Sequence, residues 1–243
     1  MKNTPADALL VPLVDDPRAS VPPEYANIPI LYEDEDIVAV SKPEGLATLP
    51  EASAKASCLR SCLEISRHER LYVVHRLDKE ASGVILFARN AAAHKFLNEQ
   101  FAERMVRKIY WALVLGELDQ DRLTIAVPLR EFGSGRVAVD PVRGKECRTD
   151  LRMLERFPGH TLVEVQPFTG RRHQIRAHLY HKGHPIAGDL RYGNRSEQRR
   201  YGRLMLHALS ITVSTPKHGT VTVTAPVPSS FVAIVDRLRS SGG

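Results

Sequence analysis

Hydrophobic residues recur at every second position in several segments of the chain, a spacing typical of β-strands with one buried face. These segments are rich in β-branched residues and are separated by Gly, Pro and Asp, which favour turns. The pattern predicts strands over 29–32, 37–41, 71–74, 84–88, 105–115, 122–127, 149–155, 161–166, 209–214 and 220–224. The polar turn YEDED is expected to join the first two strands as an antiparallel pair.

Other segments place hydrophobic residues on one face of a helix, with a spacing of three or four positions. Ser and Asn residues at their starts can accept hydrogen bonds from the first free backbone N–H groups. The pattern predicts four helices, which run from a cap at Ser53 to about Arg67, from a cap at Asn90 to Phe101, from about Arg172 to Tyr180, and over 229–240.

Strand pairs with few helices between them predict an α+β protein with a large mixed, mostly antiparallel sheet and flanking helices. Regular alternation of strand and helix is missing, as are the GxGxxG and Walker patterns that hold nucleotides on parallel sheets. Residues 1–27 are rich in Pro, Ala and Asp without periodicity and are expected to form an N-terminal tail. The folded domain is therefore expected over residues 28–243.

Positive charge exceeds negative charge and is clustered along the chain. The 243 residues include 34 Lys and Arg against 28 Asp and Glu, a formal net charge of +6. Segment 191–203 holds five Arg and two Tyr, and a second basic run extends from Arg130 to Arg148. Such clusters indicate phosphate contacts and stacking on nucleic acid, although solvated loops would have the same composition.

Cysteine usage and the N-terminal segment bear on the compartment. Cys58, Cys62 and Cys147 are an odd number and form no CxxC pair, which argues against a disulfide framework and favours a reducing compartment. The first residues contain a short apolar run that Pro12 interrupts, which fits neither a signal peptide nor a membrane span. We therefore expect a cytoplasmic protein without membrane attachment.

Histidines are frequent after residue 172, which raises the possibility of a metal site. His178, His181 and His184 follow one another at intervals of three, but no carboxylate stands at HExxH spacing. Capping and surface hydrogen bonds explain these residues better than metal binding does, so no metal site is expected.

The stretch HRLDKEASG sets Asp78 between Arg76 and Lys79 on a loop between two predicted strands. Such a loop is a common place for a reactive group, whereas the simpler interpretation is a turn Asp tied to a neighbouring Arg. Farther on, FTGRRHQIRAH places Arg172 and Arg176 one helical turn apart. One of these guanidinium groups is expected to reach Asp78 and orient it, either as part of an active site or as an ordinary salt bridge.

Glycoside hydrolysis by paired carboxylates is a rival interpretation, because that reaction also takes place at an anomeric carbon. Glu80 is the one acid close to Asp78 in sequence. A hydrolase also needs a placed water and a proton donor, and the sequence identifies neither. A metal-dependent hydrolase is a further alternative, which inhibition by chelators would reveal.

Several motifs resemble, in order, those of the RluA-type pseudouridine synthases: ILYEDEDIVAVSKPEGL, HRLDKEASGVILFARN, KIYWALVLGEL, FTGRRHQIRAHLYHKGHPIAGD and RLMLHALSI. The likeness covers roughly residues 29–228. It implies isomerisation of a uridine within tRNA or rRNA, in which the N1–C1′ bond breaks and C5 is joined to C1′. It also implies that no cofactor and no metal is required.

The resemblance assigns roles to particular residues. Asp78 matches the essential aspartate, Tyr110 the tyrosine of the K-x-Y segment, and Arg176 the basic partner of the aspartate. It implies that Tyr110 stacks on the base or accepts the C5 proton. Residues that match positions near the bound nucleotide are His75, Arg76, Arg171, Arg172, His173, Gln174 and Leu206. Ala81 departs from the Thr that is usual at its position, which removes a hydroxyl beside the proposed nucleophile.

These assignments explain the composition of the Asp78 loop. Cations around a carboxylate favour its anionic form and offset repulsion by the RNA backbone. The small segment 81–83 leaves room for a nucleotide, and Arg76 can fill the gap that an extruded base leaves. A non-catalytic RNA-binding or RNA-chaperone protein on the same fold is the alternative. Many members of that family carry an S4 RNA-binding domain, but the N-terminal 28 residues are too few for one. We therefore expect a stand-alone catalytic domain, 28–243, without an S4 domain, and a monomer.

Overall fold

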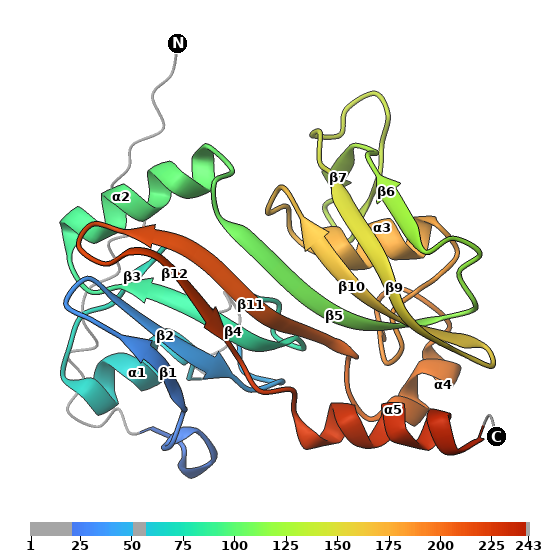
Figure 1. The fold of residues 1–243 in the computed structure, drawn as a ribbon, viewed down its shortest axis with the longest axis horizontal. Helices are drawn as coiled ribbons and strands as arrows, with labels where there is room; N and C mark the ends of the chain where they lie inside the picture. Colours follow the sequence, from blue (N-terminus) through green and yellow to red (C-terminus); the bar gives the residue numbers. More distant parts are fainter. Residues whose placement is uncertain (1–20, 51–56, 242–243) are drawn as a thin grey trace.

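The computed structural model describes residues 21–50 and 57–241. In this part of the chain ten strands form one sheet (Figure 1). They are β1 (Ile30–Glu33), β2 (Ile37–Lys42), β3 (Tyr72–Val73), β4 (Ser82–Ala88), β5 (Arg107–Leu115), β6 (Arg122–Ile125), β9 (Thr149–Phe157), β10 (His160–Pro167), β11 (Leu206–Thr215) and β12 (Gly219–Thr224). The order is β1-β2-β4-β11-β5-β10-β9-β6, with β3 beside β4 and β12 beside β11. Only β4 and β11 pair in parallel within this sheet, so the α+β class with a mixed, mostly antiparallel sheet is confirmed.

Helices flank the sheet on both halves of the molecule (Figure 1). They are α1 (Leu59–Arg67), α2 (Ala91–Ala102), α3 (Gln174–His181), α4 (Arg195–Gln198) and α5 (Ser229–Ser241). Helix α2 packs on β3, β4 and β11, whereas α3 contacts β9, β10 and a short strand, β8 (Val137–Val139). Within the described ranges, no helix combines the length and the apolar character needed to cross a bilayer.

The hydrophobic core is divided into two main clusters. One is built on β2 and β4 together with α1 and α2, and the other on β5, β9 and β10 together with α3 and α5. Strand β11 contributes Leu206 to the second cluster and Ile211 to the first, and Tyr110 of β5 packs against both. Strands β5 and β11 therefore hold the two halves together (Figure 1).

Most predicted elements are confirmed, although their ends differ by a few residues. Asn90 caps α2 by accepting a hydrogen bond from the backbone N–H of Ala93 at 2.8 Å. Ser53 lies outside the described residues, and the helix that follows begins at Leu59 with Cys58 as its cap. Of the predicted tail, residues 1–20 also lie outside the described part.

The predicted start of the third helix is wrong. Helix α3 begins at Gln174, because His173 has the left-handed backbone angle φ of 50° and interrupts the helical path. Arg172 therefore precedes the helix and does not lie one turn from Arg176 along it. The pattern of hydrophobic and polar side chains does not predict a left-handed backbone conformation at a residue other than glycine.

A short hairpin was missed by the strand prediction. It consists of β7 (Leu129–Glu131) and β8 (Val137–Val139), which form a separate two-stranded sheet. Each strand has three residues, too few for an alternating pattern to emerge. The hairpin packs through Leu129 and Val137 on a small third cluster that includes Tyr192.

Segment 191–203 contains the cluster of positive charge noted in the sequence, but its two tyrosines do not offer exposed rings for stacking. Tyr192 and Tyr201 are buried, and Arg203 is buried with its guanidinium donating to Ser82 and Ser230. These three residues stabilise the packing of the domain instead of offering a surface to nucleic acid.

The close approach of β4 and β11 depends on Gly83, which has φ of +118°. A Cβ atom there would lie 2.2 Å from the carbonyl oxygen of Ala208. We predict that Gly83→Ala lowers the free energy of unfolding by at least about 3 kcal/mol, because backbone strain adds to steric overlap. Gly159→Ala is the control, since Gly159 also has positive φ but open space around it, and should cost about 1 kcal/mol. Equal losses in urea titrations of the two variants would contradict this account.

Candidate active site

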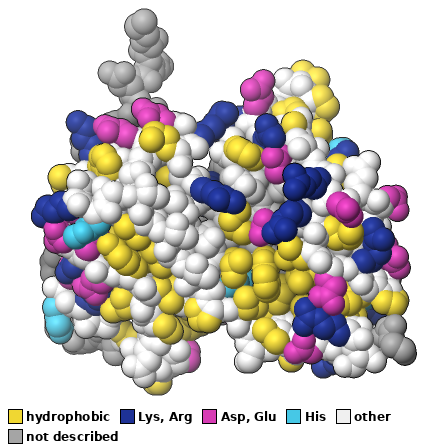
Figure 2. Space-filling model, viewed as in Figure 1, with side chains coloured by type: hydrophobic (Ala, Val, Ile, Leu, Met, Phe, Trp, Pro, Cys, Tyr) yellow, Lys and Arg dark blue, Asp and Glu magenta, His cyan; other side chains and the backbone are white. Residues whose placement is uncertain are grey.

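A cleft of about 420 Å³ lies between the two halves of the molecule. Strand β5 forms its floor, and its walls come from the loop before β4, the end of α2 and segment 167–176. Figure 2 shows the face of the molecule seen in Figure 1, where Lys and Arg side chains are more frequent over the half that carries β9 and β10. All ten residues predicted for the site line this cleft: His75, Arg76, Asp78, Tyr110, Arg171, Arg172, His173, Gln174, Arg176 and Leu206.

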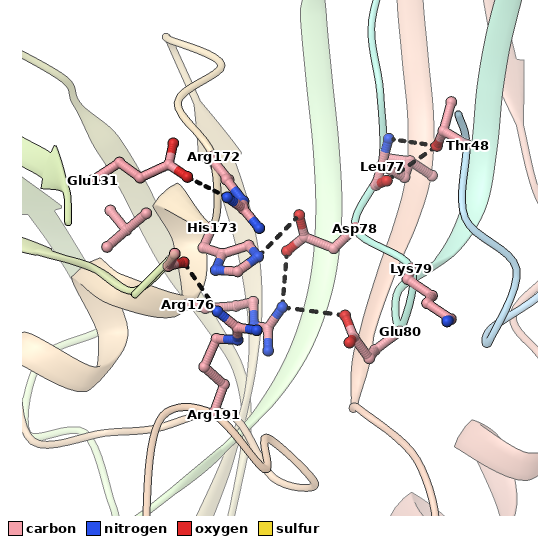
Figure 3. A network of polar contacts seen from close by, with 12 residues as sticks. Thr48, Leu77, Asp78, Lys79, Glu80, Glu131, Arg172, His173, Arg176 and Arg191 are labelled. Carbon is pink, nitrogen blue, oxygen red and sulfur yellow. Dashed lines mark hydrogen bonds and ion pairs between the residues drawn. The ribbon is translucent and has the colours of Figure 1, made fainter. Parts of the chain in front are cut away.

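The loop that carries Asp78 is fixed from the N-terminal half. The backbone N–H of Leu77 donates to the hydroxyl of Thr48 at 3.2 Å, and this hydroxyl donates back to the carbonyl of Leu77 at 3.0 Å (Figure 3). The N–H of Gly45 donates to the carbonyl of Lys79 at 2.9 Å. Residues on both sides of Asp78 are thus anchored, which limits the conformations that its carboxylate can adopt.

A buried lysine strengthens this anchor. Lys42 is 1% exposed, and its Nζ donates to the carbonyls of Pro43 and Leu46 at 2.8 Å and of Lys79 at 3.1 Å. Burial lowers the pKa of Lys42 to about 7, with Asp78 acting in the opposite direction. The KPEGL segment is part of a motif named in the sequence analysis, but no role was predicted for its lysine, although a lysine that ends an apolar strand must find partners.

Arg176 joins the Asp78 loop to the other half of the molecule. Its Nη1 lies 3.2 Å from Oδ2 of Asp78 and 3.3 Å from Oε2 of Glu80 (Figure 3). Its Nε and Nη2 donate to the two carboxylate oxygens of Asp189 at 2.7 and 2.8 Å. Burial acts to lower the pKa of Arg176, but Asp189, Asp78 and Glu80 outweigh it and the pKa is raised. The expected contact between Arg176 and Asp78 is confirmed.

Asp189 is the clearest residue that sequence reasoning missed. It is 1% exposed, and besides Arg176 it accepts hydrogen bonds from the backbone N–H groups of Arg191 and Tyr192 at 3.0 and 3.1 Å. Its two oxygens fix the guanidinium plane, so the remaining nitrogen of Arg176 points toward Asp78. The rest of α3 and the loop after it separate Arg176 from Asp189, so neither helical nor strand spacing pairs them.

His173 lies beside Asp78 on the opposite wall. Its Nε2 is 3.9 Å from Oδ1 of Asp78, and its Nδ1 is 3.1 Å from the hydroxyl of Tyr192 (Figure 3 shows the first contact). The same hydroxyl accepts a hydrogen bond from the backbone N–H of Val137 in β8. Burial lowers the pKa of His173, while Asp78 acts to raise it. The short hairpin thus supports His173, whose backbone conformation is strained. Strained backbone conformations are common at functional sites.

His75 forms part of the wall above β5. Its ring stacks on Phe101 with centroids 5.1 Å apart, and its Nε2 accepts a hydrogen bond from the backbone N–H of Leu86 at 3.0 Å. An Nε2 that accepts is unprotonated, so the ring is neutral with its proton on Nδ1. Burial lowers the pKa of His75 to about 3, and the charge of Lys108 adds to the effect.

Tyr110 and Leu206 form the inner surface of the cleft. Tyr110 projects from β5, and burial together with the charge of Asp78 raises its pKa, so the phenol is protonated at neutral pH. Leu206, at the start of β11, is buried in the second core cluster and also lines the cleft. Ala81, which replaces the usual Thr, is buried beside them. An aromatic ring and an aliphatic side chain offer a flat apolar slot for a base.

The side-chain amide of Gln174 makes four hydrogen bonds within the wall of the cleft. Its oxygen accepts from the hydroxyl of Thr169 at 2.6 Å and from the N–H of Arg171 at 3.1 Å. Its nitrogen donates to the carbonyl of Arg148 and to the hydroxyl of Thr149, both at 3.0 Å. Gln174 thus fixes the course of segment 169–171 along the cleft.

Exposed arginines surround the opening of the cleft. Arg76, Arg171 and Arg172 have exposed side chains that line the cavity. Arg172 is paired with Glu131 of the short hairpin (Figure 3). These cations can meet the phosphates of a nucleic acid without loss of a buried partner.

The histidines after residue 172 do not gather around a common point. The Nε2–H of His178 donates to the carbonyl of Val127 at 3.1 Å, and its Nδ1 lies 2.9 Å from the hydroxyl of Thr149. Among the described residues, no group of three or more His, Cys, Asp or Glu side chains is arranged to hold a metal ion.

Sequence comparison assigns the chain to a family. Residues 36–181 match a family model described as RNA pseudouridylate synthase. The ribosomal large subunit pseudouridine synthase C of Vibrio vulnificus (strain CMCP6) is 36% identical over 220 residues, which cover 87% of this chain and 70% of that protein. The uncharacterized RNA pseudouridine synthase YlyB of Bacillus subtilis (strain 168) is 34% identical over 251 residues, covering 99% and 82%.

Solved structures agree with this assignment. Human RNA pseudouridylate synthase domain containing 1 superposes with a TM-score of 0.74 at 30% identity, covering 91% of this chain and 98% of that chain. Human RNA pseudouridylate synthase domain containing 4 also gives a TM-score of 0.74, at 27% identity over 87% and 93%. Fold and matched sequence thus define an RNA-modifying isomerase. The chain belongs to the RNA pseudouridylate synthase family, within its RluA-type branch.

Removing the buried partner of Arg176 should cost far more stability than removing an exposed one. We predict that Asp189→Ala lowers the free energy of unfolding by roughly 3 to 5 kcal/mol, because it leaves a buried guanidinium without its bidentate partner. Glu131→Ala, which removes the exposed partner of Arg172, should cost about 1 kcal/mol or less. Chemical denaturation compares the two, and similar losses would show that Asp189 is not the structural support inferred here.

Burial of neutral His75 should make stability depend on pH. The pKa of His75 is lowered from 6.5 to about 3 in the folded state, so its stabilising effect is complete above about pH 6.5 and is lost as the pH falls toward 3. From pH 7 to pH 5 the wild-type protein should lose about 2 kcal/mol more than His75→Gln, in which an amide oxygen replaces the ring acceptor. Denaturant titrations at both pH values measure the difference, and parallel losses in the two proteins would refute the assignment.

Proposed function

We propose that the protein converts a specific uridine in structured RNA, either rRNA or tRNA, into pseudouridine, with Asp78 as the reacting carboxylate. The observation that carries this proposal is the placement of Asp78 in the cleft, joined to buried Arg176 across the two halves and close to Tyr110. Relatives named as ribosomal large subunit pseudouridine synthases favour ribosomal RNA. The cytoplasmic location and the monomeric state stay predictions from the sequence.

The reaction rearranges atoms within one nucleotide. The N1–C1′ bond breaks with its electron pair passing to the uracil ring, the ring turns, and C5 bonds to C1′. One proton leaves C5 and one is taken up at N1, so the product is an isomer and no oxidant or group donor is consumed. A carboxylate facing the sugar can serve by attack on C1′ or by removal of a C2′ proton, and both routes require the anionic Asp78.

The surroundings of Asp78 suit this role. Arg176 compensates its charge, and the bidentate contact with Asp189 keeps the guanidinium from turning away. The loop is anchored by Thr48 and Lys42 on its other side. The carboxylate is therefore preorganised, which lowers the reorganisation needed when the sugar arrives.

The shape of the cleft explains how RNA would engage it. A cavity of about 420 Å³ between the halves admits one nucleoside but no duplex, so the target uridine has to leave its stack. We assign Tyr110 to stack on the extruded uracil, with Leu206 beside it, and Arg76 to fill the vacated position in the RNA. Arg171 and Arg172 at the opening are placed for phosphates, and His75, His173 and Gln174 hold the walls in position.

Replacement of the carboxylate should separate binding from chemistry. We predict that Asp78→Asn abolishes pseudouridine formation, because the amide carries no negative charge, while the affinity for RNA stays within a few fold of wild type. Asp119→Asn is the matched control, since Asp119 is exposed and remote from the cleft lining. Pseudouridine-specific mapping and filter binding on unmodified transcripts provide the two readouts. Equal activity of Asp78→Asn would reject Asp78 as the reacting group.

The target is found by comparing total RNA from wild-type and deletion strains with pseudouridine-specific mapping. A site lost in the deletion strain and restored on the matching transcript by the purified protein would identify the substrate. If no site is lost and the purified protein is inactive, a non-catalytic RNA-binding or chaperone role replaces the proposed function.

A further inference from the structure

We propose that Lys108 is a further catalytic residue, whose side-chain nitrogen donates a hydrogen bond to a carbonyl oxygen of the uracil and stabilises the ring while the glycosidic bond is open. The inference deepens the proposed function and rests on it. Lys108 is a cation within the cleft to which no role has been assigned so far.

Lys108 lies on the floor of the cleft beside the surface assigned to the base. It precedes Tyr110 by two residues on β5, so both side chains project from the same face of the strand, and both line the cavity. Two residues along a strand span about 7 Å. That distance is similar to the width of a pyrimidine with its exocyclic oxygens, so a uracil stacked on Tyr110 brings one edge to Lys108.

The charge of Lys108 has no carboxylate partner among the described residues. Its Nζ donates one long hydrogen bond, 3.4 Å to the carbonyl of Thr169, and no described carboxylate lies within ion-pairing distance. The neighbouring His75 ring is neutral and cannot act as a counter-ion. Lys42, by contrast, uses its ammonium group on three carbonyls. A half-buried cation with one weak contact is costly unless a ligand completes its surroundings.

Burial lowers the pKa of Lys108 to about 8, which still leaves the ammonium form in the majority at neutral pH. The lowered pKa reflects the same shortage of partners that the geometry shows. An acceptor oxygen carried into the cleft by the substrate would remove that shortage.

A base oxygen fits Lys108 better than a phosphate does. The exposed Arg76, Arg171 and Arg172 lie at the opening of the cleft, where the RNA backbone passes. Lys108 instead projects from the strand that forms the floor, next to Tyr110. A nucleotide that enters base first brings O2 and O4 of uracil to this depth and leaves its phosphates outside.

The chemistry gives this contact its catalytic effect. When the N1–C1′ bond breaks, the electron pair spreads over N1, O2 and O4 of the uracil, and an ammonium group already in place stabilises that charge without reorganisation. When C5 bonds to C1′, the ring returns to neutrality, one proton leaves C5 and one is taken up at N1. Lys108 keeps its own protons throughout.

The test uses the full-length protein and the unmodified rRNA or tRNA transcript that the wild type modifies. Lys108→Met removes the charge at nearly constant shape, Lys108→Gln is a second neutral variant, and Lys108→Arg keeps a cationic donor. Lys95→Met, an exposed lysine on α2, is the control for loss of one positive charge. Single-turnover rates at saturating protein, RNA dissociation constants, their dependence on salt, and melting temperatures are measured for each.

The expected result is a single-turnover rate about 100-fold lower in both neutral variants, with RNA affinity and salt dependence like those of Lys95→Met. Lys108→Arg should recover part of the rate. An unchanged rate with weaker binding and a salt slope reduced by about one would overturn the inference in favour of a phosphate contact. A rate loss that disappears after correction for the folded fraction would overturn it as well. Failure of the proposed function is distinct, because the wild type itself would then be inactive.

Discussion

The buried guanidinium of Arg176 is the interaction on which the site depends. It contacts Asp189 through two nitrogens and Asp78 through the third, and it is the most direct polar link between the two walls of the cleft. A charged group this deeply buried is stable only while its carboxylate partners are in place. The arrangement therefore couples the orientation of the Asp78 carboxylate to the packing of α3 and the turn that follows it.

The two sides of the Asp78 loop are held in different ways. On the N-terminal side, Thr48, Gly45 and Lys42 bind the backbone of the loop, and these contacts fix where the loop runs. On the other side, Arg176 and His173 approach the carboxylate itself and fix where it points. Different contacts therefore fix the course of the loop and the orientation of its carboxylate.

Much of the fold and of the site could be predicted from local sequence patterns. The rest depends on contacts between residues that are far apart in the sequence. Runs of apolar, β-branched residues located β2 and β4, which are buried along almost their whole length, and alternation located β10. The motifs around Asp78 and Arg176 indicated their contact. Asp189 and Lys42 escaped notice, because their importance arises from partners that folding brings near. The left-handed His173 was also missed, since nothing in its side chain requires that backbone angle.

The division of the cleft between two core clusters has a consequence for protein synthesis. Asp78 leaves the ribosome 98 residues before Arg176. A nascent chain that already displays this acid still lacks Arg176, and the cleft lacks Leu206 until β11 has been translated. A chain that ends before α3 therefore lacks the guanidinium that orients Asp78, and the cleft can form only once residues 78 to 206 have all been synthesised.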